Sequence, residues 1–432
     1  MTKDVFSITA AELAEKGWEH APADLITTEH MIYSSPATIA FNSPGAQGFG
    51  VKRAGLAVPG SVMLLVAPGC CGRNTTLLTE VAGYENRFFY QLMDETDLVT
   101  GRHLTMIPQA VKEVVESLPK RPSCVMICIT CVDALLGTDM ERVCRKAEDA
   151  AGVPVQPCYM YALTREGRKP PMVHVRQSIY ELLKPLKKVS STVNILGYFS
   201  PLEDKSEIYT LLKSIGVKTI NEISRCPDYD SYINMASANF NLVLNPEARL
   251  AGQDLEKRLG IPMIEMARMY QIDKIENQYK SLAAVLGVEF NDTEFQFKAR
   301  AAVDAFTEKW KGASVTIGEL MNANSFELAL AMTKYGLKVE EIYGNPVQED
   351  MAFINKLAEL SPDTKIYANL SPTMIYYDSS IAKPDLTIGK DAGYYHTSCP
   401  NVMWWDAVQP FGYEGLRHLF EEMSEAMEGG SC

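Results

Sequence analysis

The sequence predicts an α/β protein of three Rossmann-like domains with parallel sheets, on the strength of three observations. Short runs of aliphatic and β-branched residues alternate with amphipathic helical stretches along most of the chain. Strands that alternate with helices favour right-handed βαβ units, which build parallel sheets. The 432 residues, 47% of them hydrophobic, are enough for more than one core.

The alternation of strands and helices restarts twice, which predicts the domain boundaries. Residues 1–57 are expected to form an N-terminal extension with a short helix over Ala10–Gly17. Residues 58–190 form the first Rossmann-like domain, which carries the conspicuous cysteines. Residues 191–305 form the second domain, and residues 306–432 form the third, which closes with a helix.

Each domain has its own series of expected elements. In the first domain the strands are Val62–Ala67, Val125–Ile129 and Val153–Tyr161, and the helices are Ile107–Ser117, Val132–Ala151 and Ser178–Leu186. In the second, the strands lie within residues 193–200, 217–223, 239–246 and 261–267, and the helices are Lys205–Ile215 and Glu247–Leu259, the latter capped by Gly260. In the third, the strands lie within residues 313–319, 337–345, 364–370 and 385–390, and the helices are Ser325–Tyr335 and Gly415–Met427.

Composition and motifs argue against several classes of function. A formal charge of −13 argues against nucleic acid as a partner, because phosphate binding needs a basic surface. The absence of any run of about 18 apolar residues and of a signal-peptide pattern predicts a cytoplasmic protein without membrane contact. No GxGxxG or GxxxxGK[ST] loop follows a strand, which argues against dinucleotide binding and ATP hydrolysis. The six histidines include no HExxH spacing, which argues against zinc hydrolysis.

Two cysteine-bearing turns follow two of the expected strands. Cys70 and Cys71 come after the first strand, while Cys128 and Cys131 stand at the end of the strand that begins at Val125. The carboxyl ends of parallel strands form the ligand-binding edge of an open α/β sheet, so we expect these residues to gather there. Cysteine thiolates, usually four, hold iron–sulfur clusters. The sequence therefore predicts an iron–sulfur cluster bound by Cys70, Cys131, Cys71 and Cys128.

A role in the core is the alternative for some cysteines, because cysteine is among the most frequently buried residue types. Cys128 lies on its strand and fits either role, whereas Cys70 and Cys131 follow a strand at a break in the pattern and favour ligation. A vicinal pair cannot easily give both sulfurs to one metal ion, so one of Cys70 and Cys71 is either a spectator or a bridge to a second site. The cysteines interpreted as core or incidental are Cys124, Cys144, Cys158, Cys226 and Cys432.

The segment DAGYYHTSCPNVMWWDAVQPFGY, which contains His396 and Cys399, is dense in aromatic residues. Such a loop could line a substrate pocket, or it could pack as an aromatic corner between domains. Two residues are candidates for a catalytic general acid, namely Asp139 and His396.

Four segments together resemble the catalytic component of nitrogenase and nitrogenase-like reductases. VAPGC resembles the family's cluster turn and places Cys70 as a ligand, and CVDALLGTDMERV resembles its second turn and places Cys131 as another. DETDLVTG falls between the two turns, where the family has a similar segment. NFNLVLNPEARLAGQDLEKRLGIPMIEM is similar to the family's strand and helix that lead into the next domain.

The resemblance implies three Rossmann-like domains per subunit, with two identical or homologous subunits sharing a cluster at their interface. That cluster would be a [4Fe–4S] cluster or a larger P-cluster-like one. The partners implied are the second subunit, in a homodimer or heterotetramer, and a separate ATP-dependent iron–sulfur reductase protein. The second partner would explain why this chain has no P-loop.

The sequence also departs from the nitrogenase pattern. Nitrogenase subunits carry a further cysteine upstream of the first turn, and residues 1–69 contain none. The cofactor-binding cysteine of the nitrogenase α subunit would fall near Asn245, and its cofactor histidine near Met403. A nitrogenase-type iron–molybdenum cofactor and dinitrogen reduction are therefore not expected.

Three hypotheses for the function follow. The favoured one is an electron-relaying subunit of a nitrogenase-like reductase, of the methylthio-alkane reductase type or, alternatively, a tetrapyrrole reductase or nickel-tetrapyrrole reductive cyclase. The second is a metallocluster assembly scaffold without turnover. The third is an α/β binding protein without metal, whose cysteines lie in the core.

Overall fold

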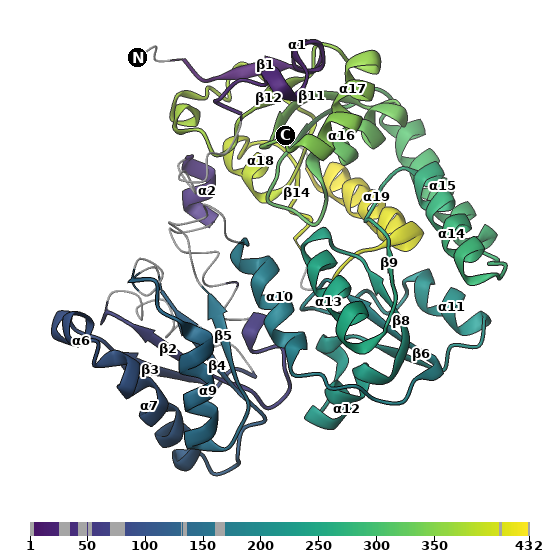
Figure 1. Ribbon diagram of the computed structural model, residues 1–432. Coiled ribbons are helices and arrows are strands. Elements are labelled where there is room, and N and C mark those ends of the chain that lie inside the picture. The colour runs from purple at the N-terminus through teal and green to yellow at the C-terminus, as the bar shows by residue number, and fades with distance from the viewer. Residues whose placement is uncertain are drawn as a thin grey trace. The chain divides into compact units, whose positions relative to one another are not determined.

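The computed structural model confirms an α/β fold in which mainly parallel strands form three sheets (Figure 1). The residues described are 4–25, 35–41, 50, 54–69, 83–130, 132, 136–159, 169–405 and 408–430. Among them, none of the helices has both the length and the apolar composition of a membrane span.

The N-terminal sheet has the strand order β3-β2-β4-β5, and every neighbouring pair is parallel. Its strands are β2 (Val62–Ala67), β3 (Phe88–Leu92), β4 (Val125–Ile129) and β5 (Val155–Tyr159). Apolar side chains of α7 (His103–Ser117) and α9 (Met140–Ala151) pack on one face, and those of α10 (Pro171–Glu181) pack on the other. Burial of both faces explains why β2 and β4 are continuous apolar runs.

The middle sheet has the order β7-β6-β8-β9, again with parallel neighbours. Its strands are β6 (Val189–Leu196), β7 (Thr219–Asn221), β8 (Ala238–Val243) and β9 (Met263–Glu265). α12 (Tyr229–Asn234) and α13 (Arg249–Leu259) belong to the same region. Gly260 ends α13 in the left-handed conformation, as the sequence predicts.

The C-terminal sheet has the order β1-β12-β11-β10-β13-β14. Its strands are β1 (Ser7–Thr9), β10 (Ser314–Ile317), β11 (Lys338–Tyr343), β12 (Lys365–Tyr367), β13 (Leu386–Ile388) and β14 (Asn401–Val402). β1 pairs antiparallel with β12, and the other neighbours are parallel. The N-terminal extension thus contributes an edge strand, which is too short to have a recognisable period in the sequence.

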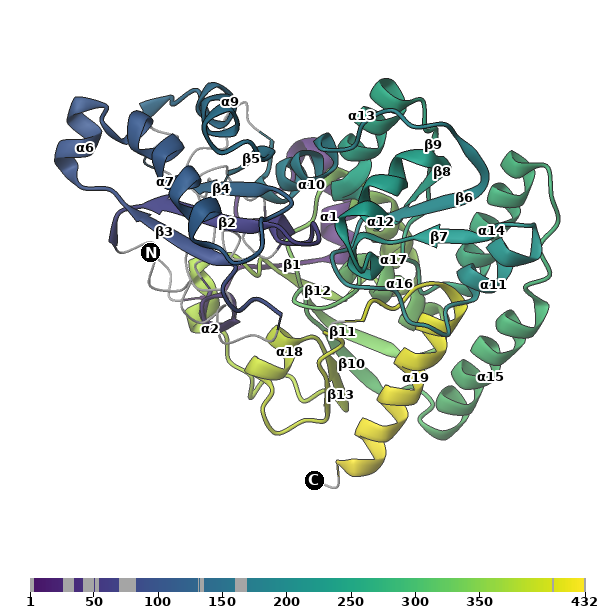
Figure 2. The same ribbon diagram turned by 90° about the horizontal axis from the view of Figure 1, so that it is seen from below.

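All three sheets are wound in the same way (Figure 2). In each sheet the first parallel strand in the chain (β2, β6 or β10) has a neighbour on both sides. The next strand (β3, β7 or β11) pairs on one side of it, and a later strand (β4, β8 or β13) pairs on the other. The strand order therefore reverses between β2 and β4, between β6 and β8, and between β10 and β13. In open α/β sheets such a switch point leaves a crevice at the carboxyl ends of the strands, where ligands bind.

The chain folds into two compact units. One consists of Met1–Pro44, Ser200–Gly216 and Arg268–Cys432, and the other of Gly45–Phe199 and Val217–Ala267. The N-terminal and middle sheets belong to the second of these units, and the C-terminal sheet to the first. The three domain boundaries inferred from the sequence stay a prediction.

The prediction of one continuous helix over Val132–Ala151 is wrong, because the backbone leaves the helical conformation at Gly137. Gly137 adopts a positive φ of 64°, and α9 begins only at Met140. Asp139 caps α9, because its carboxylate accepts a hydrogen bond from the backbone N–H of Arg142 at 2.9 Å.

Other helices differ in position or were not expected. α10 starts at Pro171 and ends at Glu181, rather than covering Ser178–Leu186, since proline suits the first turn of a helix and Pro185 disfavours helix just before it. The helices that the sequence pattern did not reveal include α6 (Glu95–Thr100), α14 (Ile272–Leu286), α15 (Thr293–Lys309), α17 (Met351–Leu360) and α18 (Lys390–Tyr395).

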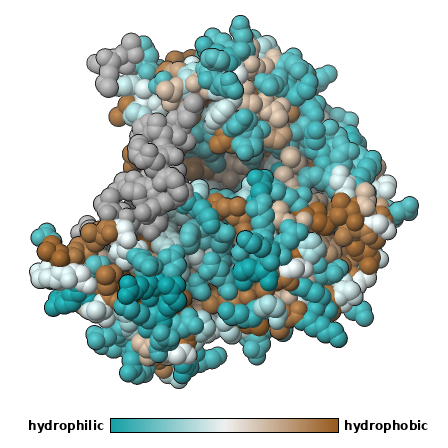
Figure 3. Space-filling model, viewed as in Figure 1, coloured by the Kyte–Doolittle hydropathy of each residue, from teal (hydrophilic) through white to brown (hydrophobic). Residues whose placement is uncertain are grey.

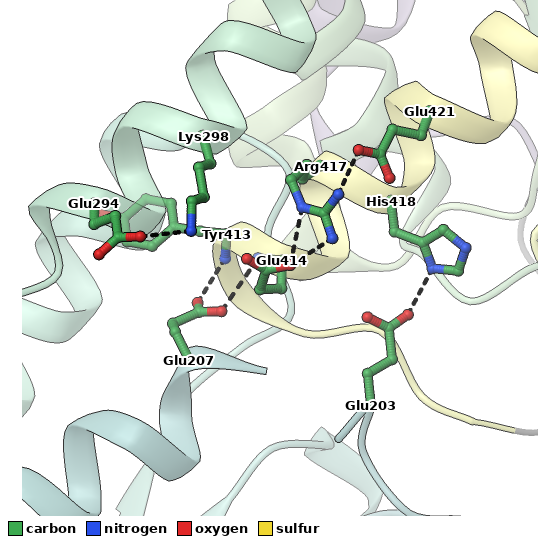
Figure 4. A network of polar contacts seen from close by, with 9 residues as sticks. All are labelled: Glu203, Glu207, Glu294, Lys298, Tyr413, Glu414, Arg417, His418 and Glu421. Carbon is green, nitrogen blue, oxygen red and sulfur yellow. Dashed lines mark hydrogen bonds and ion pairs between the residues drawn. The ribbon is translucent and has the colours of Figure 1, made fainter. Parts of the chain in front are cut away.

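Glu207, the first residue of α11 (Glu207–Ser214), holds the start of α19 (Gly412–Gly429) (Figure 4). Its carboxylate accepts hydrogen bonds from the backbone N–H groups of Tyr413 and Glu414, at 2.6 and 3.1 Å. A negative charge is favourable at a helix N-terminus, but burial raises the pKa of Glu207 to about 7. This contact ties the segment 200–216 to the C-terminal helix.

One ion pair strengthens the same attachment, and another lies within α19 itself (Figure 4). Nδ1 of His418 lies 2.7 Å from a carboxylate oxygen of Glu203, and Arg417 pairs with Glu414 on its own helix. Hydrogen bonds with Glu203 and Glu422 raise the pKa of His418 to about 10.

Replacing Gly412 with alanine should destabilise the fold. Gly412 has a φ of 68°, and a β-carbon there would overlap the carboxylate of Glu207. We expect Gly412→Ala to lower the free energy of unfolding by about 2 kcal/mol or more, measured by urea denaturation. The control Gly336→Ala has a φ of 88° but open space around its β-carbon, and should cost only about 1 kcal/mol. Equal losses at the two positions would contradict the overlap.

The buried carboxyl of Glu207 should make stability depend on pH. Because its pKa is raised in the folded state, the native protein binds this proton more tightly than the unfolded chain does. Stability should therefore fall as pH rises from about 4.5 to about 7. Glu207→Gln should reduce that slope by about one proton, whereas Glu425→Gln, at an exposed position on α19, should not. An unaltered slope in Glu207→Gln would show that Glu207 is ionised throughout.

Candidate functional site

The carboxyl ends of β2 and β4 lie side by side in the N-terminal sheet. The two strands pair in parallel, with Val66 opposite Ile129. β2 therefore ends at Ala67 on the edge where β4 gives way to Thr130. This edge is also the switch point of the sheet, since β3 lies beyond β2 on one side and β4 on the other.

Three of the predicted ligands follow these strand ends within a few residues. Cys70 and Cys71 follow β2, and Cys131 follows Thr130 directly. All three lie outside the described residues, so their ligand role stays a prediction. The register of β2 against β4 nevertheless fixes where the two segments that carry them begin.

Thr130 is a buried polar residue at this edge that the sequence reasoning missed. It is 0% exposed, and its hydroxyl has no hydrogen-bond partner among the described residues. A buried hydroxyl left without a partner costs about 1 to 3 kcal/mol, and a bound group that accepts a hydrogen bond would remove that cost. The sulfide or thiolate of a cluster is such an acceptor, and the residues present therefore fit an iron–sulfur group. Its position directly before Cys131 is the signal that could have found it.

Cys128 lies inside β4, opposite Leu65 on β2 and Cys158 on β5. It is 0% exposed and belongs to the apolar cluster that includes Met126 and Val175. Its ligand role stays a prediction, and its surroundings are those of a core residue.

The other described cysteines do not form a metal site. Burial raises the pKa of the Cys124 thiol to about 12 and that of Cys158 well above its ordinary value, so both stay protonated. Cys144 is 4% exposed and packs against the opposite face of the sheet. Among the described residues, no group of three or more histidine, cysteine, aspartate or glutamate side chains is arranged to hold a metal ion.

The segment DETDLVTG forms the short helix α6 directly after β3. Asp94 and Asp97 make a capping box, in which each side chain accepts a hydrogen bond from the other's backbone N–H. The Asp97 carboxylate also pairs with Arg102, and Gly101 ends the helix in the left-handed conformation. The segment is therefore a capped helix at the carboxyl edge of the sheet.

Tyr159, at the end of β5, makes a polar contact and an aromatic contact. The Tyr159 hydroxyl donates to Glu141 at 2.8 Å, and the Tyr159 ring packs edge-on against His174, with ring centroids 4.2 Å apart. Burial lowers the pKa of His174 to about 4, so this imidazole is neutral at pH 7. His174 was not expected from the sequence, because no spacing pattern marks it.

The switch point of the middle sheet lies at Gly197 and Asn245. Gly197 has a φ of 132°, and a β-carbon there would come within 2.8 Å of Asn245. The Asn245 side chain accepts a hydrogen bond from the backbone N–H of Glu247. Asn245 is the position at which nitrogenase α subunits are expected to carry their cofactor cysteine, and here it serves as a turn residue.

The switch point of the C-terminal sheet carries two carboxyl groups that sequence reasoning missed. The Asp391 carboxylate accepts hydrogen bonds from the backbone N–H of Glu319 and from the Asn369 amide, at 2.8 and 3.0 Å. Burial raises the pKa of Asp391 to about 6 and that of Glu319 to about 7. Gly318 and Gly389, directly after the two strands, are the signals that could have located this edge.

The two candidates for a general acid occupy different settings. Asp139 is exposed and caps α9. His396 is 3% exposed and is surrounded by tyrosines in the unit that contains the C-terminal sheet. A catalytic role for either residue stays a prediction.

The described strands form three sheets of one winding, and the predicted ligands Cys70 and Cys131 follow β2 and β4 in the sequence, as in proteins of the nitrogenase-like class. A family model described as nitrogenase component 1 type oxidoreductase matches residues 46–428, and the chain belongs to that family.

Individual relatives agree with this assignment. The chain is 23% identical to the nitrogenase iron-molybdenum cofactor biosynthesis protein NifE of Sinorhizobium fredii (strain NBRC 101917 / NGR234), over 78% of this chain and 71% of that protein. It is also 23% identical to the NifE protein of Rippkaea orientalis (strain PCC 8801 / RF-1), over 78% and 73% of the two chains. The solved structure of nitrogenase Cp1 at pH 6.5 superposes with a TM-score of 0.70 over 94% of each chain, at 16% identity, which establishes a common fold.

Proposed function

We propose that this chain is the cluster-holding subunit of a nitrogenase-like reductase, which relays low-potential electrons to a substrate. The observation that carries the proposal is the register of β2 against β4, which starts both cysteine turns at one switch point. Membership of the nitrogenase component 1 type family supports the same chemistry.

Cys70 and Cys131 are the proposed ligands of the iron–sulfur cluster, with Cys71 as a third. Cys128 is the fourth candidate, although its burial in the apolar cluster favours a core role. A chain with few ligands fits a [4Fe–4S] or P-cluster-like group that is completed by a second, identical or homologous subunit. The cluster would supply one-electron transfer, and the Thr130 hydroxyl would donate a hydrogen bond to it and so help to set its potential.

The electron donor proposed is a separate ATP-dependent iron–sulfur reductase protein. This chain has no P-loop of its own, so the energy of ATP hydrolysis must enter through a partner. Reduction of methylthio-alkanes or of tetrapyrroles stays a prediction, which the fold and the relatives described above do not support.

A second candidate function is a metallocluster assembly scaffold without turnover. The similarity to NifE proteins favours it, because these relatives are named for cofactor biosynthesis. A scaffold would pass its cluster to an acceptor protein, whereas a reductase subunit would keep it through repeated cycles of reduction. Iron retention after incubation with a cluster-free acceptor separates the two functions.

Exposed apolar residues of β3 and α6 are the proposed contact with the second subunit. Val99 on α6 is 88% exposed and Leu92 on the outermost strand β3 is 56% exposed, and Figure 3 shows apolar side chains at the surface over α6. Exposed apolar residues on an edge strand and its neighbouring helix are typical of a protein interface.

Removing the Cys131 thiol should remove iron. We expect anaerobically prepared Cys131→Ala to lose roughly half or more of its iron and the visible absorption of the cluster, because a cluster seldom tolerates the loss of a thiolate. Cys144→Ala, which truncates a buried cysteine of the core, is the matched control and should keep its iron. Full iron content in a folded Cys131→Ala protein would refute the assignment.

Placing a charge at Val99 should weaken subunit association. We expect Val99→Glu to raise the dissociation constant of the assembly about tenfold or more, because the carboxylate would be desolvated in the interface. Sedimentation velocity measures the change. Val285→Glu, at a residue 68% exposed on α14, is the control and should leave association unaltered. Wild-type association of Val99→Glu would exclude α6 from the interface.

A further inference from the structure

A compact group of oxygen and nitrogen donors lies in the unit that contains the C-terminal sheet, and we call it the tyrosine–histidine cluster. It consists of Glu341 and Tyr343 on β11, Tyr377 after the short helix Pro372–Tyr376, and His396 after α18. Glu341 and Tyr343 are two residues apart on the strand, so their side chains lie on the same face of the sheet. Glu341 and His396 are each 3% exposed and Tyr343 is 0% exposed, whereas Tyr377 is partly exposed.

Four atoms of this cluster, two phenol oxygens, one carboxylate oxygen and one imidazole nitrogen, form six pairs. Five of these pairs lie within hydrogen-bonding distance. The two phenol oxygens, of Tyr343 and Tyr377, are 2.7 Å apart. They lie 3.0 and 2.7 Å from Oε2 of Glu341, and 2.8 and 3.0 Å from Nε2 of His396. Only the sixth separation, between Glu341 Oε2 and His396 Nε2, is longer, at 3.6 Å.

The protons available are too few for these contacts. Each phenol contributes one proton, and Nε2 of His396 contributes at most one. The carboxyl of Glu341 contributes at most one more. Four protons at most cannot fill five short contacts, so at least one of the five brings lone pairs face to face. A buried polar group that is not satisfied by protons calls for a bound ion or water.

The geometry fits a metal ion at the centre of the cluster. An octahedral centre with bonds of about 2 Å separates neighbouring donors by about 2.8 Å and opposite donors by about 4 Å. Five short separations and one long one are the pattern of four such donors, with Glu341 and His396 opposite each other. The midpoint between these two lies about 1.8 Å from each and about 2.2 to 2.3 Å from both phenol oxygens, close to ordinary metal–ligand lengths.

The donor set indicates which ion would be bound. Oxygen donors select hard cations, and the imidazole nitrogen suits iron among them. One carboxylate and two phenolates carry three negative charges, which a trivalent ion neutralises inside the protein. We propose that the tyrosine–histidine cluster binds a single trivalent, oxygen-preferring metal ion such as Fe³⁺. Binding releases the two phenolic protons of Tyr343 and Tyr377 to solvent and leaves two neighbouring positions open.

The surroundings of the cluster support such a site. The Tyr367 hydroxyl donates to the other carboxylate oxygen of Glu341 at 3.2 Å and so fixes the orientation of that ligand. The partial exposure of Tyr377 gives the ion a path from solvent. The proposal is independent of the iron–sulfur cluster, since it involves none of the cysteines.

The test uses Ga³⁺, a trivalent probe that is redox-silent and colourless. The full-length protein is dialysed against a chelator and titrated with gallium nitrilotriacetate, and tyrosinate formation is followed by ultraviolet difference absorption. We expect saturation at one Ga³⁺ per chain, with two tyrosinates formed. Fe³⁺ at the same site should give a visible phenolate-to-iron charge-transfer band.

Variants separate this site from other binding. Tyr377→Phe should halve the tyrosinate signal and weaken Ga³⁺ binding about tenfold or more, and Tyr343→Phe/Tyr377→Phe should abolish the signal. Tyr395→Phe is the matched control: its ring lies 5.2 Å from that of Tyr343, but its hydroxyl accepts from the backbone N–H of Ala37 instead. It should bind Ga³⁺ as the wild type does. Circular dichroism and urea unfolding establish that each variant is folded.

Two outcomes would overturn the proposal. One is a folded wild-type protein that forms no tyrosinate with Ga³⁺, which would leave a purely hydrogen-bonded cluster. The other is an undiminished signal in Tyr343→Phe/Tyr377→Phe, which would place the ion elsewhere. The same titration on Cys70→Ala/Cys131→Ala should be unaltered, so that failure of this proposal is distinguished from failure of the iron–sulfur assignment.

Discussion

The parallel register of β2 against β4 is the constraint on which the functional interpretation depends. Because Val66 lies opposite Ile129, the turn that leads to Cys70 and the turn that leads to Cys131 begin at the same edge of one sheet. The chain places β3 beyond β2 and then returns to the other side, which makes this edge a switch point. The unpartnered hydroxyl of Thr130 lies there too, where a sulfur-containing group would satisfy it.

The same winding occurs three times, with different chemistry at each switch point. Cysteine turns follow the first, while the second has Gly197 packed closely against Asn245. The third has the carboxyl groups of Glu319 and Asp391, whose pKa values burial raises to about 7 and about 6. One backbone plan therefore carries different residues at each switch point. Within such a family these residues, and not the fold, must distinguish one function from another.

The sequence predicted β2 and β4 to the residue, because a strand buried on both faces is a continuous apolar run with sharp ends. It missed β3, an edge strand that is half exposed and lacks such a run. It extended α9 back to Val132, because helix propensity there conceals the turn at Gly137 and the cap at Asp139. Among the site residues, the cysteines could be proposed from their position after strands, but the partners of His396 could not. Glu341 and Tyr343 are more than fifty residues away from it in the chain, and no periodicity records a contact over that distance.

The most direct test of the central claim is anomalous diffraction at the iron absorption edge, on crystals of the assembly purified and grown without oxygen. We expect a strong iron peak just beyond the carboxyl ends of β2 and β4, within bonding distance of the sulfurs of Cys70 and Cys131. An iron-free edge there, in crystals of a complete and folded assembly, would contradict the claim and would leave the β2–β4 switch point as a feature of the fold alone.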